Sequence, residues 1–219
     1  MPLAVFDLDE TLVQADSASL WSRYLVEQGY VTEPGFLQKE SELMELYAAG
    51  KLDMADYMSF SLSPLKGKPA AEIRAMLPQF IESWIKPRIY PQAFDLLSDL
   101  NQRGYRLLII SATAEFLVRP IALELGVADV LAIDSEYDDR GCHSGRTRGI
   151  LTFREGKVLR LQQWLSDQGL TLEGARFYSD SMNDLPLLER VDHPVATNPD
   201  SRLHRLATDR NWEILDWRS

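Results

Sequence analysis

Residues 3–13, with the sequence LAVFDLDETLV, decide the fold of this chain. The apolar run at residues 3–6 predicts a short strand buried on both faces, as in a parallel sheet. Asp7 and Asp9 follow it two residues apart, and in extended backbone two such side chains point to the same side. Carboxylates this close repel each other unless a cation lies between them. The spacing therefore suggests a site for a hard divalent metal ion at the end of the strand.

Helical patterns dominate the next part of the chain. Apolar side chains recur there at helical spacing in several successive segments, with no β-branched run between them. Asp16 or Ser17 is placed to cap the first of these helices. We therefore expect a helical insertion at residues 16–88, within a main unit formed by residues 1–15 and 89–219.

The remainder of the chain, from Pro91, alternates predicted helices and short apolar strands. Beyond the first strand, we expect strands at residues 105–110, 130–133, 176–178, 195–196 and 212–215. The polar, glycine-rich stretch at 134–155 is interpreted as a β-hairpin or a long loop. Alternating strands and helices indicate an α/β fold with a doubly wound parallel sheet and right-handed crossovers. Such sheets bind ligands beyond the carboxyl ends of their strands.

Three further polar motifs fall at predicted strand ends or helix starts. They are Ser111-Ala112-Thr113, Lys157 and Tyr178-Ser179-Asp180-Ser181-Met182-Asn183-Asp184. With Asp7, Asp9 and Thr11, they resemble the four signature motifs of the haloacid dehalogenase-like (HAD) phosphohydrolases, in family order and at comparable separations. The resemblance extends over essentially the whole chain and is greatest to subfamily IB, whose members are phosphoserine-phosphatase-like or histidinol-phosphatase-like. It implies a Rossmann-like, three-layer α/β/α core with an inserted helical cap of the C1 type over the active site.

The resemblance also implies which residues do the chemistry. Asp7 would attack phosphorus to form an aspartyl-phosphate intermediate, and Asp9 would protonate the leaving oxygen and then activate water. Mg²⁺ would be held by Asp7, the main-chain carbonyl of Asp9 and Asp180. An acid at position 9 is typical of the phosphatases of this superfamily, whereas the dehalogenases lack it.

Further polar residues are candidates for binding the phosphate or supporting the site. The phosphate ligands would be Ser111, Ala112 and Lys157, and the supporting residues Thr11, Thr113, Asn183 and Asp184. Simpler interpretations stay open for three of them. Ser111 could be a helix cap, Lys157 a solvated surface charge, and Asp184 the N-cap of the helix that follows it. A lysine at a helix start is unfavourable unless an anion such as phosphate offsets it, and Asp184 could also orient that lysine.

Composition limits which molecules the protein is expected to bind and in which cellular compartment it is expected to lie. The formal net charge of −10 disfavours nucleic acid or an anionic membrane as a partner, and no apolar stretch approaches the ~20 residues of a membrane span. The first residues run directly into the predicted strand, which leaves no room for a signal peptide. The single cysteine, Cys142, cannot form an internal disulfide. We therefore expect a cytoplasmic, monomeric protein whose partner is a small-molecule phosphomonoester.

The expected function is Mg²⁺-dependent hydrolysis of a small phosphorylated metabolite that carries an amine, such as histidinol phosphate or phosphoserine. Asp16 lies nine residues after Asp7, and in the resembling phosphoserine phosphatases an acid near this place meets the substrate's ammonium group. Asp16 could instead be only a helix cap. Neither Arg23 nor Arg74 matches a partner for a substrate carboxylate, which favours an amine without one. The alternatives are a phosphotransferase or mutase of the same fold, and a receiver-type signalling domain phosphorylated on aspartate.

Overall fold

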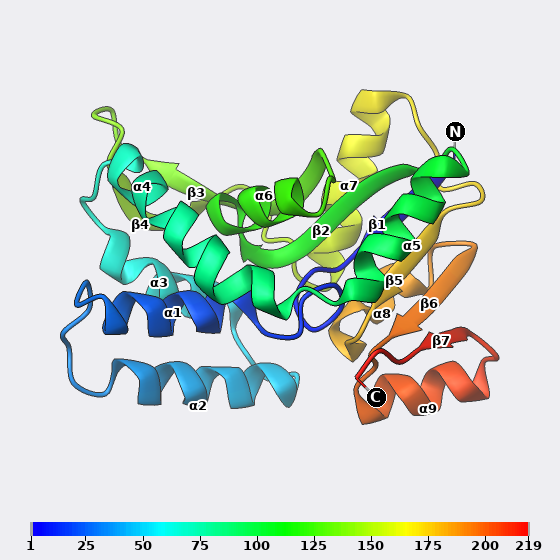
Figure 1. Cartoon of the computed structure of the whole chain (residues 1–219), viewed down its shortest axis with the longest axis horizontal. Coiled ribbons are helices and arrows are strands. Elements are labelled where there is room, and N and C mark those ends of the chain that lie inside the picture. Colours follow the sequence, from blue (N-terminus) through cyan, green and yellow to red (C-terminus); the bar gives the residue numbers. More distant parts are fainter. Residues whose placement is uncertain (1, 219) are drawn as a thin grey trace.

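The computed structural model describes residues 2–218 and is built around one seven-stranded sheet (Figure 1). The strands lie in the order β4-β3-β2-β1-β5-β6-β7, and every neighbouring pair is parallel except β3 and β4. Their bounds are β1 Leu3–Phe6, β2 Arg106–Ala114, β3 Asp129–Tyr137, β4 His143–Arg148, β5 Arg176–Ser179, β6 His193–Thr197 and β7 Glu213–Leu215. The predicted first strand thus lies at the centre of the sheet. This confirms the α/β fold class and the mostly parallel sheet.

Helices cover both faces of the sheet, and β1 shows why. Its side chains alternate, so that Ala4 and Phe6 join one apolar cluster while Leu3 and Val5 join the other. The first cluster packs against α5 (Pro91–Gln102) and α6 (Glu115–Glu124). The second packs against α7 (Glu155–Gln168), α8 (Leu185–Leu188) and α9 (Ser201–Asp209). All four strand residues are buried, as the unbroken apolar run predicts.

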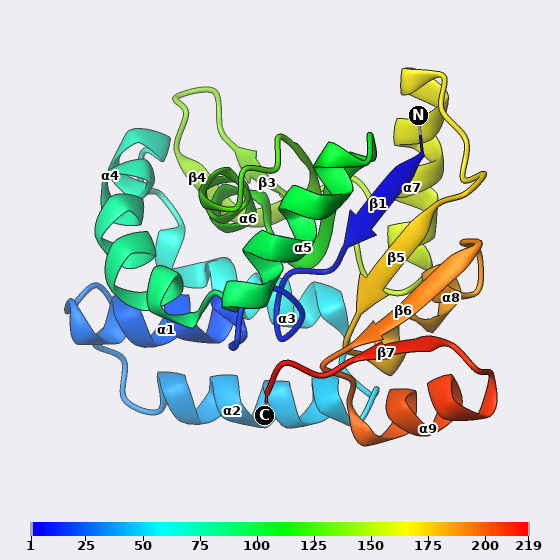
Figure 2. The same ribbon diagram turned by 45° about the vertical axis from the view of Figure 1, so that its right-hand side comes forward.

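The predicted insertion is helical throughout its regular elements. It contains α1 (Ser17–Glu27), α2 (Phe36–Ala48), α3 (Met54–Leu62) and α4 (Ala70–Phe80), and it returns through a π-helical turn at Ile81–Ile85. In Figure 2 the arrow of β1 points toward α1 and α3. The carboxyl ends of the central strands therefore face these helices. No helix within residues 2–218 has the length and apolar character needed to cross a bilayer.

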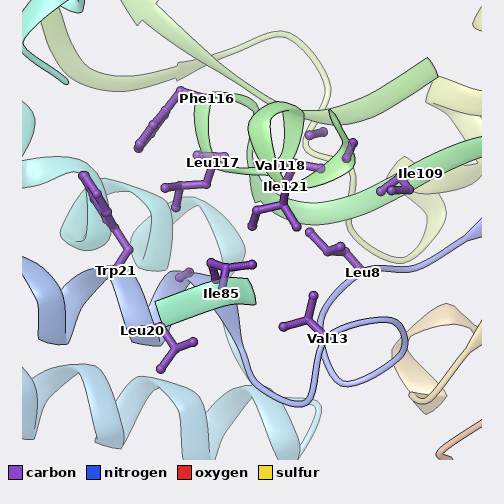
Figure 3. Close-up of a cluster of buried hydrophobic side chains, with 14 of the residues drawn as sticks. Leu8, Val13, Leu20, Trp21, Ile85, Ile109, Phe116, Leu117, Val118 and Ile121 are labelled. Atoms are coloured by element: carbon purple, nitrogen blue, oxygen red, sulfur yellow. The ribbon is translucent and has the colours of Figure 1, made fainter. Parts of the chain in front are cut away.

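Apolar packing joins the insertion to the α/β part without a break. Figure 3 shows Trp21 of α1 across from Phe116 of α6, with Ile85 and Leu8 to the right of Trp21. The ring centroids of Trp21 and Phe116 are 5.9 Å apart, and those of Trp21 and Phe80 are 5.0 Å apart. One buried cluster contains all of these residues. The base of the insertion is consequently held by the same core as the sheet.

The polar stretch at 134–155 contains the end of β3 and all of β4, which form a β-hairpin, one of its two predicted forms. β3 and β4 pair antiparallel, and the hairpin also bonds to the insertion through backbone groups. The Gly67 N–H donates to the His143 carbonyl at 2.8 Å, and the His143 N–H donates to the Lys68 carbonyl at 2.8 Å. The insertion therefore has a second backbone attachment to the α/β part, far in sequence from its two ends.

Several predicted element boundaries are wrong, and two of them bear on the site. β2 runs to Ala114 rather than ending at Ile110, because β3 continues to pair with it beyond the end of β1 (Ala114 with Ile133). Helix α7 begins at Glu155, two residues before Lys157. The polar Ser111 thus lies inside a strand, where a pattern based on apolar runs cannot find it.

Candidate active site

The sequence motifs converge at the carboxyl ends of β1, β2 and β5, beneath the insertion. A cavity of about 410 Å³ lies there. The expected residues that line it are Asp7, Asp9, Asp16, Ala112, Thr113, Asp180 and Asn183. The other expected residues, Thr11, Ser111, Lys157 and Asp184, are buried behind this lining and contact it or each other. All of the candidate residues therefore belong to one place in the fold.

Lys157 joins the first and last motifs. Its Nζ lies 2.8 Å from Asp7 Oδ1 and 2.8 Å from Asp184 Oδ2, and the Ser179 hydroxyl also donates to Asp184 Oδ2 at 2.8 Å. Only 2% of Lys157 is exposed, so the surface-charge interpretation is wrong. Burial alone would lower the pKa of Lys157, but the charges of Asp184 and Asp7 outweigh it and hold the pKa above its usual range. These two carboxylates also offset the unfavourable position of a cation at a helix start.

The side chain of Asp184 contacts Lys157 and does not cap the helix after it. Its backbone stands at the N-cap position of α8, but its side chain makes no hydrogen bond to that helix. Both known partners of the side chain, Lys157 and Ser179, come from elsewhere in the fold. The N-cap interpretation is therefore wrong for the side chain.

Asp7 is a buried carboxylate with one oxygen committed to Lys157. Burial raises the pKa of Asp7 to about 7, Lys157 opposes that rise, and the charges of Asp184 and Asp9 add to it. Its backbone N–H donates to the Tyr178 carbonyl at 2.9 Å, which ties the end of β1 to β5. The side chain is thus fixed from two directions.

Asp9 is held by hydrogen bonds to both of its oxygens. The Ser17 N–H donates to Oδ1 at 2.8 Å, and the Thr113 hydroxyl donates to Oδ2 at 2.8 Å. Burial raises the pKa of Asp9 to about 6, the charge of Asp16 adds to the rise, and the hydrogen bonds from Ser17 and Thr113 limit it. A carboxyl that titrates near neutral pH can both give and take a proton during a reaction.

Asp180 is positioned by Thr11. The Thr11 hydroxyl donates to Asp180 Oδ1 at 3.2 Å and accepts from the Asp180 backbone N–H at 3.1 Å. Burial, followed by the charges of Asp7 and Asp184, raises the pKa of Asp180 well above its usual range. Thr11, the last residue of the first motif, thus sets the geometry of a carboxylate 169 positions away.

These residues fit a divalent cation because negative charge is in excess. Four carboxylates (Asp7, Asp9, Asp180 and Asp184) lie at the site with a single ammonium, that of Lys157, which contacts two of them. Within residues 2–218, no three His, Cys, Asp or Glu side chains form a ready-made metal cluster. The expected set uses two side chains, Asp7 and Asp180, and a main-chain carbonyl. Mg²⁺ commonly takes few protein ligands and keeps several waters, so such a sparse set suits it.

Ser111 is not a helix cap. The N-cap position of α6 is Ala114, and the Ser111 hydroxyl oxygen accepts from the Thr113 backbone N–H at 3.0 Å. Ser111 is fully buried at its place in β2. Accepting through the oxygen leaves the hydroxyl proton available as a donor to an anion.

Two arginines missed by the sequence reasoning tie the insertion to the site. Arg154 Nη2 donates to the Gly50 carbonyl at 2.6 Å and to Asn183 Oδ1 at 3.2 Å. Arg202 Nη2 donates to the Ala48 carbonyl at 2.9 Å. Both reach the carboxyl end of α2, where free carbonyls favour a cation. The sequence carries little signal for this, beyond the nearness of Arg154 to Lys157.

The family of the chain follows from comparison with known proteins. A family model for haloacid dehalogenase-like hydrolases matches residues 4–189. The chain belongs to this family. The HAD chain is 35% identical, over 99% of its length and 99% of the other, to a protein of Neisseria meningitidis named histidinol-phosphatase. It is 34% identical, over 98% of its length and 70% of the other, to a protein of Mycobacterium tuberculosis named phosphoserine phosphatase.

Solved structures agree with this HAD assignment. A Bordetella pertussis protein of unknown function superposes with a TM-score of 0.91 at 38% identity, covering 99% of this chain and 98% of that one. A phosphoserine phosphatase carrying an analogue of the phospho-aspartyl intermediate superposes with a TM-score of 0.72 at 20% identity, covering 99% and 93%. The second likeness bears on the fold alone. Together these results confirm the predicted family and fold and identify the chain as a HAD-family phosphatase.

Proposed function

We propose that this phosphatase hydrolyses a small phosphomonoester with a cationic leaving group, through an aspartyl-phosphate on Asp7, with Mg²⁺ bound. The observation that carries the proposal is the pairing of Asp7, fixed by Lys157, with Asp9, whose pKa is raised to about 6 by burial in the same cavity. One carboxylate is placed to attack and the other to transfer a proton.

The reaction can be followed through the chain's own groups. Lys157 binds Asp7 Oδ1, so we assign the attack on phosphorus to Oδ2. As the Oδ2–P bond forms, the bond from phosphorus to the ester oxygen breaks, and protonated Asp9 gives its proton to that oxygen. Asp9, now ionised, takes a proton from water, which attacks phosphorus and releases phosphate and free Asp7. Lys157 and the Ser111 hydroxyl would stabilise the phosphoryl oxygens in both steps.

Mg²⁺ would be held by Asp7, Asp180 and the main-chain carbonyl of Asp9. It would supply positive charge to the phosphoryl group and reduce the repulsion between that group and the carboxylates. The raised pKa of Asp180 supports this assignment, because burial beside other carboxylates without a cation disfavours its charged form.

We infer that residues 16–88 act as a cap that shapes the substrate site. Asp16 and four side chains of α2 and α3 line the cavity together with the catalytic motifs, namely Met44, Tyr47, Met54 and Tyr57. Asp16 caps α1 through the Ser19 N–H at 2.7 Å and lines the cavity as well, so its two interpretations are compatible. Arg23 and Arg74 are not among the described residues that line the cavity.

An alcohol that carries an amine but no carboxylate remains the favoured leaving group, and histidinol phosphate is the first compound to test. The cavity lining has several acids and one basic side chain, Arg202, which is engaged by the Ala48 carbonyl. The relative named histidinol-phosphatase supports the same choice. Phosphoserine, whose carboxylate would face these acids, is the second.

A phosphate-release assay over a panel of phosphomonoesters tests this function. We expect Mg²⁺-dependent release with histidinol phosphate preferred, loss of release in excess EDTA, and recovery on adding Mg²⁺. Repeating the assay with an acceptor alcohol distinguishes hydrolysis from phosphotransfer, because a transferase would place phosphate on the alcohol. Release that is unchanged by chelation, or absent for every ester, would contradict the proposal. Membership of the HAD family argues against the alternative of a receiver-type signalling domain.

A further inference from the structure

Arg154 stands directly before α7, three residues ahead of Lys157, and the proposed chemistry has no use for it. Its backbone has φ of 51° and ψ of −120°, a conformation that is unfavourable for a residue with a side chain. The start of a helix also disfavours a cation. The guanidinium lies over the ring of Phe153, with its Cζ 4.8 Å from the ring centroid. These costs point to a role for the contacts that the side chain makes.

One nitrogen of this guanidinium joins the insertion to the active-site motif after β5. Arg154 Nη2 donates to the Gly50 carbonyl at 2.6 Å and to Asn183 Oδ1 at 3.2 Å, and Nε donates to the same amide oxygen at 3.3 Å. Gly50 lies just after α2 in the insertion, whereas Asn183 belongs to the helical turn Met182–Asp184. The position of the guanidinium against Asn183 therefore depends on the end of α2 being docked on the α/β part.

The contact with Arg154 decides which way the Asn183 amide faces. A guanidinium has donors only, so the amide oxygen must point toward Arg154 and the Nδ2 group must point away from it. Asn183 lines the cavity, and no described residue accepts a hydrogen bond from its Nδ2. The cavity is thus offered two N–H donors rather than a lone pair. Donors suit the negatively charged oxygens of a phosphoryl group, whereas an amide oxygen would repel them.

We propose that Arg154 is a positioning residue, which orients the Asn183 amide toward the phosphoryl group when the insertion is docked over the cavity. Docking of the end of α2 then completes the site, because the same guanidinium nitrogen holds Gly50 and Asn183. Arg202 donates to the Ala48 carbonyl at the same end of α2, and its contacts do not include Asn183. It would hold the insertion without orienting the amide. This inference rests on the proposed function, because it assumes a phosphoryl group in the cavity.

The test is a double-mutant cycle on kcat for the best ester of the panel. Arg154→Met should lower kcat by roughly 10- to 100-fold, since misplacing a group by about 1 Å can cost about that much. In an Asn183→Ala protein the same change should lower kcat by less than about threefold, because the amide that Arg154 positions is no longer there. Arg202→Met is the matched control. It loosens the same helix end, so its fold effect on kcat should be equal in both backgrounds.

The possible outcomes separate this inference from the function on which it rests. Equal fold losses from Arg154→Met in both backgrounds, or a wild-type kcat in that variant, would overturn the positioning role and leave the phosphatase proposal standing. Hydrolysis of no ester would overturn the phosphatase proposal. The cycle would then be measured by calorimetry on the binding of inorganic phosphate with Mg²⁺, where non-additive losses support the positioning role and additive losses, or no binding, refute it.

A second variant covers the case in which Arg154→Met does not fold. Arg154→Lys keeps the positive charge but lacks the planar fork that donates from two nitrogens to one amide oxygen. Its loss of kcat should again be largely absent in the Asn183→Ala background. An equal fold loss in both backgrounds would overturn the inference.

Discussion

Replacing Lys157 by methionine should destabilise the protein and stop the reaction together. Methionine keeps much of the side-chain volume but removes the ammonium that lies 2.8 Å from both Asp7 and Asp184. Removing one member of a buried ion pair typically costs about 3–5 kcal/mol, because the remaining charge is left without a partner. For a chain of this size, 1 kcal/mol corresponds to roughly 2–4 °C in Tm, so a drop of roughly 6–20 °C is expected.

Activity should fall for a separate reason. Burial already raises the pKa of Asp7 to about 7 with Lys157 opposing the rise, so loss of the lysine will raise it further. Less of Asp7 will then be in the carboxylate form that attacks phosphorus. Loss of one preorganised donor to the phosphoryl group adds a factor of roughly 10²–10³. We therefore expect kcat/KM to fall by at least about 100-fold.

The assays are urea unfolding in EDTA, thermal unfolding, and phosphate release with Mg²⁺. Lys51→Met, at an exposed lysine, is the matched control and should leave both properties near wild type. Adding Asp184→Asn to Lys157→Met should restore part of the stability, since it removes one of the two unpaired carboxylates, but no activity. A Lys157→Met protein within about 1 kcal/mol of wild type would refute the account of this buried network.

Three further predictions concern other parts of the structure. Gly156→Ala should lower the free energy of unfolding in urea by about 1–3 kcal/mol, because the new Cβ would lie 1.8 Å from the Leu151 carbonyl oxygen. A decrease no larger than that of Ser166→Ala, at an exposed site, would contradict this. Asp16→Ala should lower the free energy of unfolding by about 1 kcal/mol through the loss of a helix cap. It should lower kcat/KM far more on an aminated phosphoester than on p-nitrophenyl phosphate, and equal losses would leave only the cap role. Burial lowers the pKa of His143, so below about pH 6.5 the unfolded chain takes up a proton that the folded protein does not. The raised pKa values of Asp7, Asp9 and Asp16 act in the opposite direction, so the comparison is with His143→Gln: the stability of the wild type relative to this variant should fall as pH drops below that value, and an equal pH dependence in both would exclude the histidine as a contributor.

The central strand and the motifs at its edge could be predicted because their signals are local. An apolar run followed by Asp7 and Asp9 fixes a buried strand and places two acids at its end, whatever the rest of the chain does. Parallel strands then bring Ser111 and Asp180 to the same edge, since their carboxyl ends meet there. Order along the chain was therefore enough to assemble most of the candidate site.

The contacts made by the insertion could not be predicted in the same way. Arg154 and Arg202 reach the end of α2 only because the insertion folds back over the sheet, and no spacing in the sequence encodes that distance. The sequence does not distinguish Glu40 from the other charged residues of its helix, and only the packing of the fold shows that it is buried. The end of β2 was misplaced because pairing with β3, rather than apolar character, extends the strand through Ser111.

Trapping phosphate on Asp7 tests the central claim most directly. Enzyme mixed with substrate and Mg²⁺ is quenched in acid, digested with pepsin, and its peptides are examined by mass spectrometry. We predict phosphate on the peptide containing Asp7, more of it in Asp9→Asn because water activation fails there, and none in Asp7→Asn, which should also lose turnover. Phosphate on a different residue, or turnover retained by Asp7→Asn, would contradict the assignment of Asp7 as the nucleophile.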